Sequence, residues 1–376
     1  MSKARYILVG GFLGAGKTTA ILRLAEHLHR QGLQVGLITN DQSVGLVDTA
    51  MLSSHGFSVE EITGGCFCCK FNSLVEASDR LSEQNRPDVF IAEPVGSCTD
   101  LKATVDYPLR RLYGDNFAIA PLSVLVDPVR ALRILGLESG KSFSQKVSYI
   151  YGKQLEEAEV IVINKIDLLT QDRLDSLRAA LKARFPAARV LTISARQATG
   201  IEQWLDQIAD AAPRIAGAMD VDYATYAEGE ALLGWLNCTL RVSGREPFDG
   251  NATVLQLANE IQTRLRSCGV EVAHLKMTLS PSEGNDLAVA NLVRTDHSPE
   301  LSHVLDESLS AGELIINLRA EADPEMLRRE ILSAIESVSG SGMLTSRLLH
   351  LESFRPGKPV PVHRLEAVAV GAGRPE

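Results

Sequence analysis

The stretch Gly11-Phe-Leu-Gly-Ala-Gly-Lys-Thr18 decides the fold of this chain. It fits the pattern G-x-x-x-x-G-K-[ST], follows an apolar strand expected at residues 6–9 and precedes a helix expected at residues 18–30. Glycines let successive backbone N–H groups turn inward around phosphate oxygens, and the N-terminus of the helix adds its dipole. A Gly-rich turn between core elements is the structural alternative, and the flanking strand and helix disfavour it. The stretch therefore predicts a phosphate-binding loop.

Individual residues of this loop are expected to have separate tasks. Lys17 would reach the β- and γ-phosphates of a nucleotide, and the hydroxyl of Thr18 would ligate Mg²⁺. The other loop residues that we expect to contact the nucleotide are Gly11, Gly14, Ala15, Gly16 and Thr19.

A second motif, N-K-x-D, ends at Asp167 and follows a strand expected at residues 160–163. A carboxylate at Asp167 can accept hydrogen bonds from the N1–H and N2–H₂ groups of guanine, and adenine lacks this donor pair. A Ser-Ala pair follows the next expected strand and fits a backbone contact to the guanine O6. The sequence therefore predicts GTP and GDP as ligands, with the base held by Asn164, Lys165, Asp167, Ser194 and Ala195.

Two acidic residues at strand ends are candidates for the phosphate side of the site. Glu93 ends a strand expected at residues 89–92 and could hold Mg²⁺ through water, while the N–H of Gly96 could sense the γ-phosphate. Asp41 could orient the attacking water or contact Mg²⁺. A surface ion pair for Glu93 and a turn-forming role for Asp41 are the structural alternatives. With Lys17, these two acids form the expected catalytic set; slow hydrolysis is expected, because no Arg or Gln stands out as a transition-state stabiliser.

Three of the six cysteines fall in the segment Gly64-Gly-Cys66-Phe-Cys68-Cys69-Lys70. Thiols this close can ligate one ion such as Zn²⁺, Co²⁺, Ni²⁺ or Cu⁺. Because Cys66-Phe-Cys-Cys69 is also a C-x-x-C motif, redox chemistry remains an alternative, as does simple packing. Cys98 is a candidate fourth thiolate, with packing favoured.

Together these residues resemble the CobW family, which is related to the UreG and HypB nickel-maturation GTPases. The resemblance rests on the motifs at residues 10–19, 64–69, 93–96 and 164–167 and covers about the first 210 residues. It implies a GTP hydrolase that handles a metal, either as a metallochaperone or as an insertase for a metal cofactor. It also implies a client metalloenzyme as partner; a homodimer is left open. A GTP-gated sensor or adaptor, with structural or redox-active cysteines, is the alternative function.

Strand and helix patterns divide the chain into four parts. Short apolar runs alternate with amphipathic stretches over residues 1–212, which predicts an α/β P-loop NTPase domain with a doubly wound, mostly parallel sheet. A linker is expected at residues 213–230 and a smaller α+β C-terminal domain at residues 231–353. The Pro/Gly-rich tail at residues 354–376 is expected to be extended or disordered.

The composition excludes several classes of protein. The net charge is −9 and no dense block of Lys and Arg occurs, so we expect no nucleic-acid partner. The sequence has no run of apolar residues long enough to span a bilayer and no signal-peptide core at its N-terminus. We therefore expect a cytoplasmic protein without a membrane partner.

Overall fold

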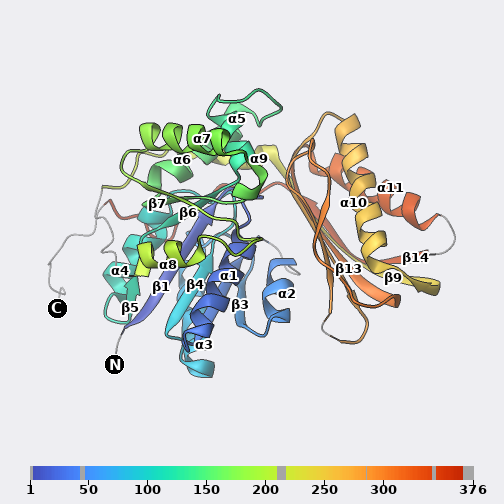
Figure 1. Cartoon of the computed structure of the whole chain (residues 1–376), viewed down its shortest axis with the longest axis horizontal. Helices are drawn as coiled ribbons and strands as arrows, with labels where there is room; N and C mark the ends of the chain where they lie inside the picture. The colour runs from blue at the N-terminus through green and yellow to red at the C-terminus, as the bar shows by residue number, and fades with distance from the viewer. Residues whose placement is uncertain (1–2, 43–46, 210–216, 285, 341–343, 367–376) are drawn as a thin grey trace.

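The computed structural model of the chain describes residues 3–42, 47–209, 217–284, 286–340 and 344–366. Within them, two sheets form two domains that lie side by side (Figure 1). The first domain has a parallel sheet in the order β3-β2-β4-β1-β6-β7-β8, with β5 added beside β1. Its strands are β1 (Ala4–Gly11), β2 (Val35–Asn40), β3 (Ser58–Ile62), β4 (Val89–Glu93), β5 (Phe117–Ile119), β6 (Ser123–Val126), β7 (Val160–Ile163) and β8 (Arg189–Thr192).

Helices cover both faces of this parallel sheet. Alternate residues of β1 enter different cores: Ile7 packs in the core that contains α1 and α8, and Leu8 packs in the core that contains α3 and α6. The predicted α/β fold is therefore confirmed. The helices are α1 (Lys17–Arg30), α2 (Val47–Ser54), α3 (Phe71–Asn85), α4 (Tyr107–Tyr113), α5 (Pro128–Ile134), α6 (Gln145–Glu157), α7 (Gln171–Arg184), α8 (Ile201–Ala209) and α9 (Tyr223–Leu232).

The second domain is an antiparallel sheet in the order β12-β11-β10-β13-β9-β14, with two helices packed on one face. This is the predicted α+β domain. Its elements are β9 (Leu233–Phe248), α10 (Gly250–Ser267), β10 (Glu271–Pro281), β11 (Ala288–Leu292), β12 (Glu300–His303), β13 (Leu309–Glu321), α11 (Pro324–Ser339) and β14 (Leu344–Phe354).

The structure adds detail to two segments that the sequence analysis expected to be irregular, and it corrects the first of them. Residues 223–230 of the predicted linker belong to α9, which packs against α6 with Gly229 close to the Lys146 carbonyl. Residues 355–366 of the tail, which was expected to be extended or disordered, are extended and hydrogen-bonded to the first domain, for example from the Leu365 N–H to the Ala103 carbonyl at 2.9 Å. Low periodicity did not reveal these contacts, because they depend on distant partners. Residues 210–216 and 367–376 lie outside the described residues.

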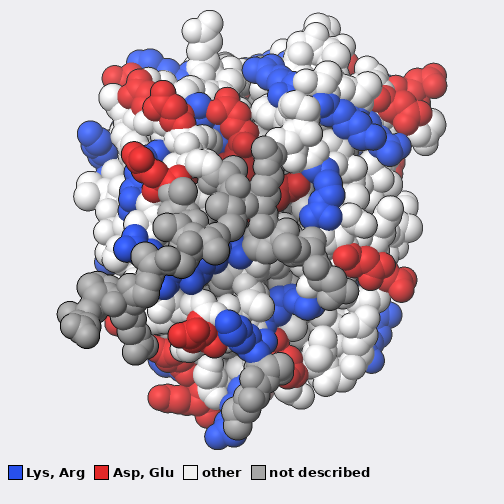
Figure 2. All heavy atoms as spheres, turned by 90° about the vertical axis from the view of Figure 1, so that its left-hand side faces the viewer, with Lys and Arg blue, Asp and Glu red and all other residues white. Residues whose placement is uncertain are grey.

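Two surface properties bear on the excluded partners. Lys/Arg and Asp/Glu side chains are interspersed on the face of the first domain that looks away from the second (Figure 2). No described helix combines the length and the apolar character that crossing a bilayer requires.

Candidate nucleotide and metal site

The loop between β1 and α1 depends on glycines for its path. Gly14 and Gly16 have φ angles of 79° and 84°, in the left-handed region that side chains disfavour. Gly11 has a φ of 132°, and a Cβ atom there would lie 2.3 Å from the carbonyl oxygen of Leu125 on the neighbouring strand. The loop therefore closes over the end of the sheet only with glycine at these positions.

Lys17, Thr18 and Glu93 meet at the start of α1. The Lys17 ammonium lies 3.7 Å from Glu93 Oε1, and the Thr18 hydroxyl lies 3.2 Å from the same oxygen. All three side chains are buried, and burial lowers the pKa of Lys17. The structure thus brings together three residues that the sequence analysis assigned to phosphate and Mg²⁺.

Asp48, at the start of α2, is a fourth member that the sequence analysis missed. The Thr18 hydroxyl donates to its Oδ1 at 2.5 Å. Burial raises the pKa of Asp48, but the nearby Lys276 ammonium and the Thr18 hydroxyl outweigh it, so the net shift is downward. Asp48 therefore presents a carboxylate beside the hydroxyl expected to ligate Mg²⁺.

These oxygens fit a hard divalent cation. Glu93 Oε2 is buried and has no hydrogen-bond partner among the described residues. Burial, with repulsion from Asp48, raises the pKa of Glu93 to about 7. Hydroxyl and carboxylate oxygens are the protein ligands that Mg²⁺ prefers, so Thr18, Asp48 and Glu93 form a suitable donor set.

Asp41 makes a different contact from the one predicted. Its carboxylate pairs with Arg319 of the C-terminal domain, whose Nη2 lies 3.0 Å from Oδ2. Burial raises the pKa of Asp41 more than the Arg319 charge lowers it. The acids that contact Thr18 are Asp48 and Glu93, and the predicted role of Asp41 in orienting water or Mg²⁺ stays a prediction.

Hydrogen bonds join the N-K-x-D motif to the phosphate-binding loop. Asn164 donates from Nδ2 to the Ala15 carbonyl at 2.9 Å and accepts from the Ala195 N–H at 3.0 Å. The Lys165 ammonium donates to the Gly14 carbonyl at 2.6 Å. These contacts place the loop next to both segments predicted to hold the base.

Asp167 and Gly96, the remaining predicted residues, lie at opposite sides of the loop. Asp167 lines the main cavity and accepts from the Ser194 hydroxyl at 2.5 Å. Gly96 packs against the loop, since a Cβ atom there would lie 2.7 Å from a methyl group of Leu13. Gly96 therefore lies against the phosphate-binding loop, and its role toward the γ-phosphate stays a prediction.

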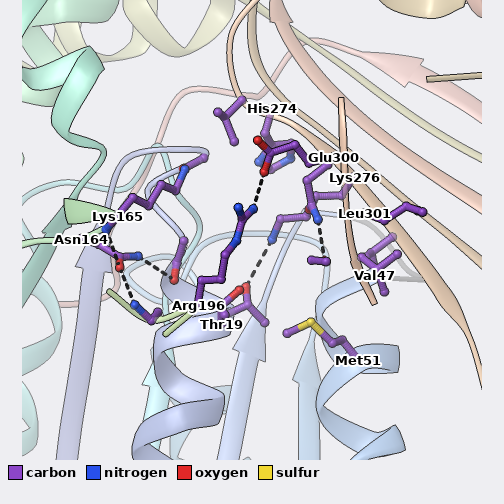
Figure 3. Close-up of a pocket in the computed structure, with 18 of the residues that line it drawn as sticks. Thr19, Val47, Met51, Asn164, Lys165, Arg196, His274, Lys276, Glu300 and Leu301 are labelled. Atoms are coloured by element: carbon purple, nitrogen blue, oxygen red, sulfur yellow. Dashed lines mark hydrogen bonds and ion pairs between the residues drawn. The ribbon is translucent and has the colours of Figure 1, made fainter. Parts of the chain in front are cut away.

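A cavity of about 400 Å³ lies between the two domains. Thr19, Asn164 and Lys165 line it from the first domain, and His274 and Lys276 reach in from β10 of the second (Figure 3). The nucleotide-binding motifs therefore open onto a space that the C-terminal domain closes.

Two arginines and one aspartate hold the domains together beside this cavity. Arg294 Nη1 lies 3.1 Å from Asp127 Oδ1, and Arg130 donates to the Val272 and Ala273 carbonyls at 3.3 and 3.2 Å. Burial raises the pKa of Asp127, but Lys165 and Arg294 outweigh it and lower the net value. Asp127 follows β6 as Glu93 ends β4, so an acid at a strand end was the signal that could have found it. No local signal marks Arg294.

The cysteine motif forms a compact cluster. The sulfur of Cys66 lies 2.7 Å from that of Cys68 and 3.2 Å from that of Cys69. The three sulfurs lie within 4.8 Å of one another, the spacing of a shared metal site. Hydrogen bonding with Cys68 and Cys69 lowers the pKa of Cys66, which favours a thiolate there. Cys98 is buried and hydrogen-bonds within the same cluster, and burial raises its pKa.

The C-terminal tail crosses this cysteine cluster. The Val360 N–H donates to the sulfur of Cys69 at 3.3 Å, and the Val362 N–H donates to the Cys68 carbonyl at 2.9 Å. Arg364 anchors the tail through an ion pair of 2.8 Å with Asp100. The tail therefore covers part of the cluster and supplies a hydrogen bond to one of its sulfurs.

Asn40 connects the cysteine cluster to the nucleotide site. It stands at the end of β2, next to Asp41, and donates from Nδ2 to the Ile62 and Gly65 carbonyls at 3.0 and 2.7 Å. Gly65 immediately precedes Cys66, so one side chain joins the strand end at the nucleotide site to the start of the cluster.

Comparisons with known proteins identify the family of the first domain. Residues 5–192 match the domain described as "CobW/HypB/UreG, nucleotide-binding domain". The zinc chaperone YeiR of Escherichia coli K12 is 31% identical over 172 residues, which cover 46% of this chain and 49% of that protein. The zinc chaperone CobW of a Sinorhizobium species is 29% identical over 198 residues, covering 47% of this chain and 55% of that protein. The chain thus spans about half the length of the curated relatives it matches.

Solved structures show lower sequence identity to this chain. The hydrogenase maturation factor HypB from Archaeoglobus fulgidus is 20% identical, with a TM-score of 0.38, over 54% of this chain and 87% of that one. Family membership rests on the domain match, which covers half of the residues. The chain belongs to the CobW/HypB/UreG family.

Proposed function

We propose that this chain is a Mg²⁺-dependent GTPase that couples GTP binding and hydrolysis to the binding and delivery of a transition metal. Zn²⁺ is the first candidate, because the similar proteins YeiR and CobW are named zinc chaperones. Co²⁺ and Ni²⁺ remain possible cargo, since thiolates also accept them. A client metalloenzyme would receive the ion.

The nucleotide part of the proposal follows from the contacts around the phosphate-binding loop. Lys17 would bind the terminal phosphates, and the oxygens of Thr18, Asp48 and Glu93 would hold Mg²⁺. When bound, Mg²⁺ supplies positive charge that offsets the charge of the phosphates. Asp167 would select guanine, with Asn164 and the Ser194-Ala195 pair positioning the base. Asp41 and Gly96 would respond to the terminal phosphate from the two neighbouring strand ends.

One observation carries the coupling part: the hydrogen bonds of Asn40 to the carbonyls on either side of the loop that precedes Cys66. The residue that follows Asn40 at the end of β2 is Asp41, which lies beside the nucleotide site. A nucleotide that shifts the end of β2 must therefore shift the support of the cysteine cluster. Linkage requires the reverse as well: a metal bound better in one nucleotide state favours that state by the same factor.

The proposal is tested by metal affinity in both nucleotide states. Competition with a chromophoric chelator should give Zn²⁺ affinities that differ at least about five-fold between the GDP form and the form bound to a non-hydrolysable GTP analogue. Equal affinities would contradict the coupling. A protein purified anaerobically without metal and unable to bind Zn²⁺ would instead favour the sensor or adaptor function. Equal affinity for ATP and GTP would contradict the assignment of the base site.

A further inference from the structure

A row of polar side chains crosses the face of the C-terminal sheet that looks toward the first domain. His274 and Lys276 on β10 pair in register with Arg319 and Asn317 on β13. Residues two apart on a strand share a face, so these four side chains lie together. The residues that alternate with them along β10, Leu275 and Met277, point to the opposite face and pack in the core with α10 and α11.

This row holds both ends of the segment that runs from β2 to α2. At one end Arg319 pairs with Asp41 at 3.0 Å. At the other end the Val47 N–H donates to Asn317 Oδ1 at 3.1 Å, and Lys276 forms an ion pair with Asp48. The C-terminal sheet therefore binds this segment through hydrogen bonds and ion pairs on each side of residues 43–46. Residues 43–46 lie outside the described part of the chain.

Lys276 reaches furthest into the nucleotide site. Its ammonium donates to the Thr18 hydroxyl at 3.2 Å in addition to its ion pair with Asp48. Thr18 Oγ1 and Asp48 Oδ1 belong to the donor set that fits Mg²⁺. A lysine ammonium is a compact charge on a flexible stem, so it can occupy a cation position and leave it again. Two cations cannot share the same two oxygens, because their mutual repulsion is strong at contact distance.

We propose that Lys276 is a tethered cation that competes with Mg²⁺ for Thr18 and Asp48. In the nucleotide-free chain, Lys276 holds these oxygens and keeps the C-terminal sheet docked on the phosphate site. Binding of Mg²⁺ with nucleotide displaces Lys276 and removes one of the three contacts through which the sheet grips the segment. The second domain thereby senses the occupancy of the nucleotide site. This inference rests on the proposed binding of Mg²⁺ and guanine nucleotide.

A second position for Lys276 makes the opposite prediction. If the lysine instead contacted the terminal phosphate beside bound Mg²⁺, it would favour the triphosphate and would not oppose the metal ion. The two positions are separated by the dependence of nucleotide binding on Mg²⁺ concentration, which is a binding measurement and needs no turnover.

The experiment uses the full chain and a fluorescent N-methylanthraniloyl derivative of GDP. The rate of loss of this probe is measured against Mg²⁺ concentration for the wild type, Lys276→Met and Lys276→Arg. Arg133→Met is the matched control, because it breaks the interdomain ion pair between Arg133 and Asp296, which lies outside the Mg²⁺ donor set. Thermal unfolding of each variant checks that it is folded.

We expect Lys276→Met to retain the probe at a Mg²⁺ concentration at least about five-fold lower than the wild type needs. Lys276→Arg should stay near the wild type, and so should Arg133→Met. An unchanged or higher Mg²⁺ requirement in folded Lys276→Met would overturn the inference. So would an equal effect of Arg133→Met, which would mean that loosened docking, and not competition, is responsible.

The failure of the proposed function would look different. A wild-type chain that retains no probe at any Mg²⁺ concentration would overturn nucleotide binding and the inference with it. A wild-type chain that retains the probe, with a Lys276→Met variant that binds the triphosphate analogue more weakly relative to GDP, would overturn the inference alone and assign Lys276 to the phosphate.

Discussion

The nucleotide site and the cysteine cluster are built in opposite ways. The nucleotide site collects the ends of β1, β4 and β7 and is closed by β10 of another domain. The cysteine cluster takes its three sulfurs from four consecutive positions, and the buried Cys98 and a covering tail reach it from elsewhere. A site assembled from distant segments changes its geometry when the two domains move relative to each other. A site built from adjacent residues changes only when another segment contacts it. Asn40 provides such a contact here.

The largest expected effect comes from a substitution in the nucleotide site. Lys17→Ala removes the ammonium expected at the terminal phosphates, and loss of one such electrostatic contact costs about 10²–10³-fold in turnover. We expect GTP turnover, measured by phosphate release, to fall by that factor while Zn²⁺ binding at the cysteines persists. The exposed Lys182 on α7, changed to alanine, is the control. Unchanged turnover in a folded Lys17→Ala variant would remove the phosphate-loop assignment.

The next largest effect is expected from a substitution in the cysteine cluster. Cys68→Ser replaces a buried sulfur with an oxygen that binds soft ions poorly. Loss of an outer-shell partner alone typically costs 10–100-fold in metal affinity, so loss of a direct ligand should cost at least about 100-fold. Chelator competition measures the change, and Cys268→Ser is the control because Cys268 is exposed and lies in the second domain. Equal losses in the two variants would show that the cluster is not the metal site.

The two sites also differ in how much of each could be predicted from the sequence. The closeness of the three cysteines could be predicted, because they stand in one motif, whereas the hydrogen bond from the tail to Cys69 could not. The nucleotide site was predicted where a motif carries the chemistry, as at Lys17 and Asp167. Asp48 and Lys276 were missed, since a single charged residue has no local signal and acquires its role only when another segment folds against it. For the same reason the sequence indicated a linker at α9 and did not indicate the contacts of the tail.

Glu157 contacts the segment at residues 96–102, which runs from Gly96 beside the phosphate-binding loop past Cys98 in the cysteine cluster. It lies on α6 and accepts from the Lys102 N–H at 3.1 Å and from the Thr99 hydroxyl at 3.3 Å, just beyond Gly96 and Cys98. Burial raises its pKa to about 8. A raised pKa means that the folded chain keeps a proton that the unfolded chain releases near pH 4.5, so stability from this group is present below pH 4.5 and is lost as the pH rises to about 8.

Glu157→Gln should remove this loss, because the amide keeps a hydrogen-bond acceptor without the charge. Between pH 5 and pH 9 the free energy of unfolding should shift in favour of the variant by about 4 kcal/mol relative to the wild type. Chemical denaturation at several pH values measures the difference. Glu156→Gln, at an exposed neighbouring position, should show no such trend. A constant difference across this range would mean that Glu157 stays ionised in the folded chain.

The smallest expected effect concerns the tail, which covers part of the cysteine cluster. Arg364 holds the tail through Asp100 and through the Met219 carbonyl at 2.9 Å. A hydrogen bond to a charged group contributes about 1.5–3 kcal/mol, and about 1.4 kcal/mol corresponds to a factor of ten. Arg364→Ala should therefore speed the transfer of Zn²⁺ to a chelator about ten-fold, as measured by stopped-flow absorbance. The control is Arg355→Ala, which loosens the same tail where it leaves the second domain, at Asp323 and Ala231. If the tail covers the cluster as its hydrogen bonds to Cys68 and Cys69 indicate, only the variant at Arg364 should change the rate. Equal rates in both variants and the wild type would mean that Zn²⁺ leaves by a path that the tail does not cover, and control of the cysteine cluster would then fall to Asn40 alone.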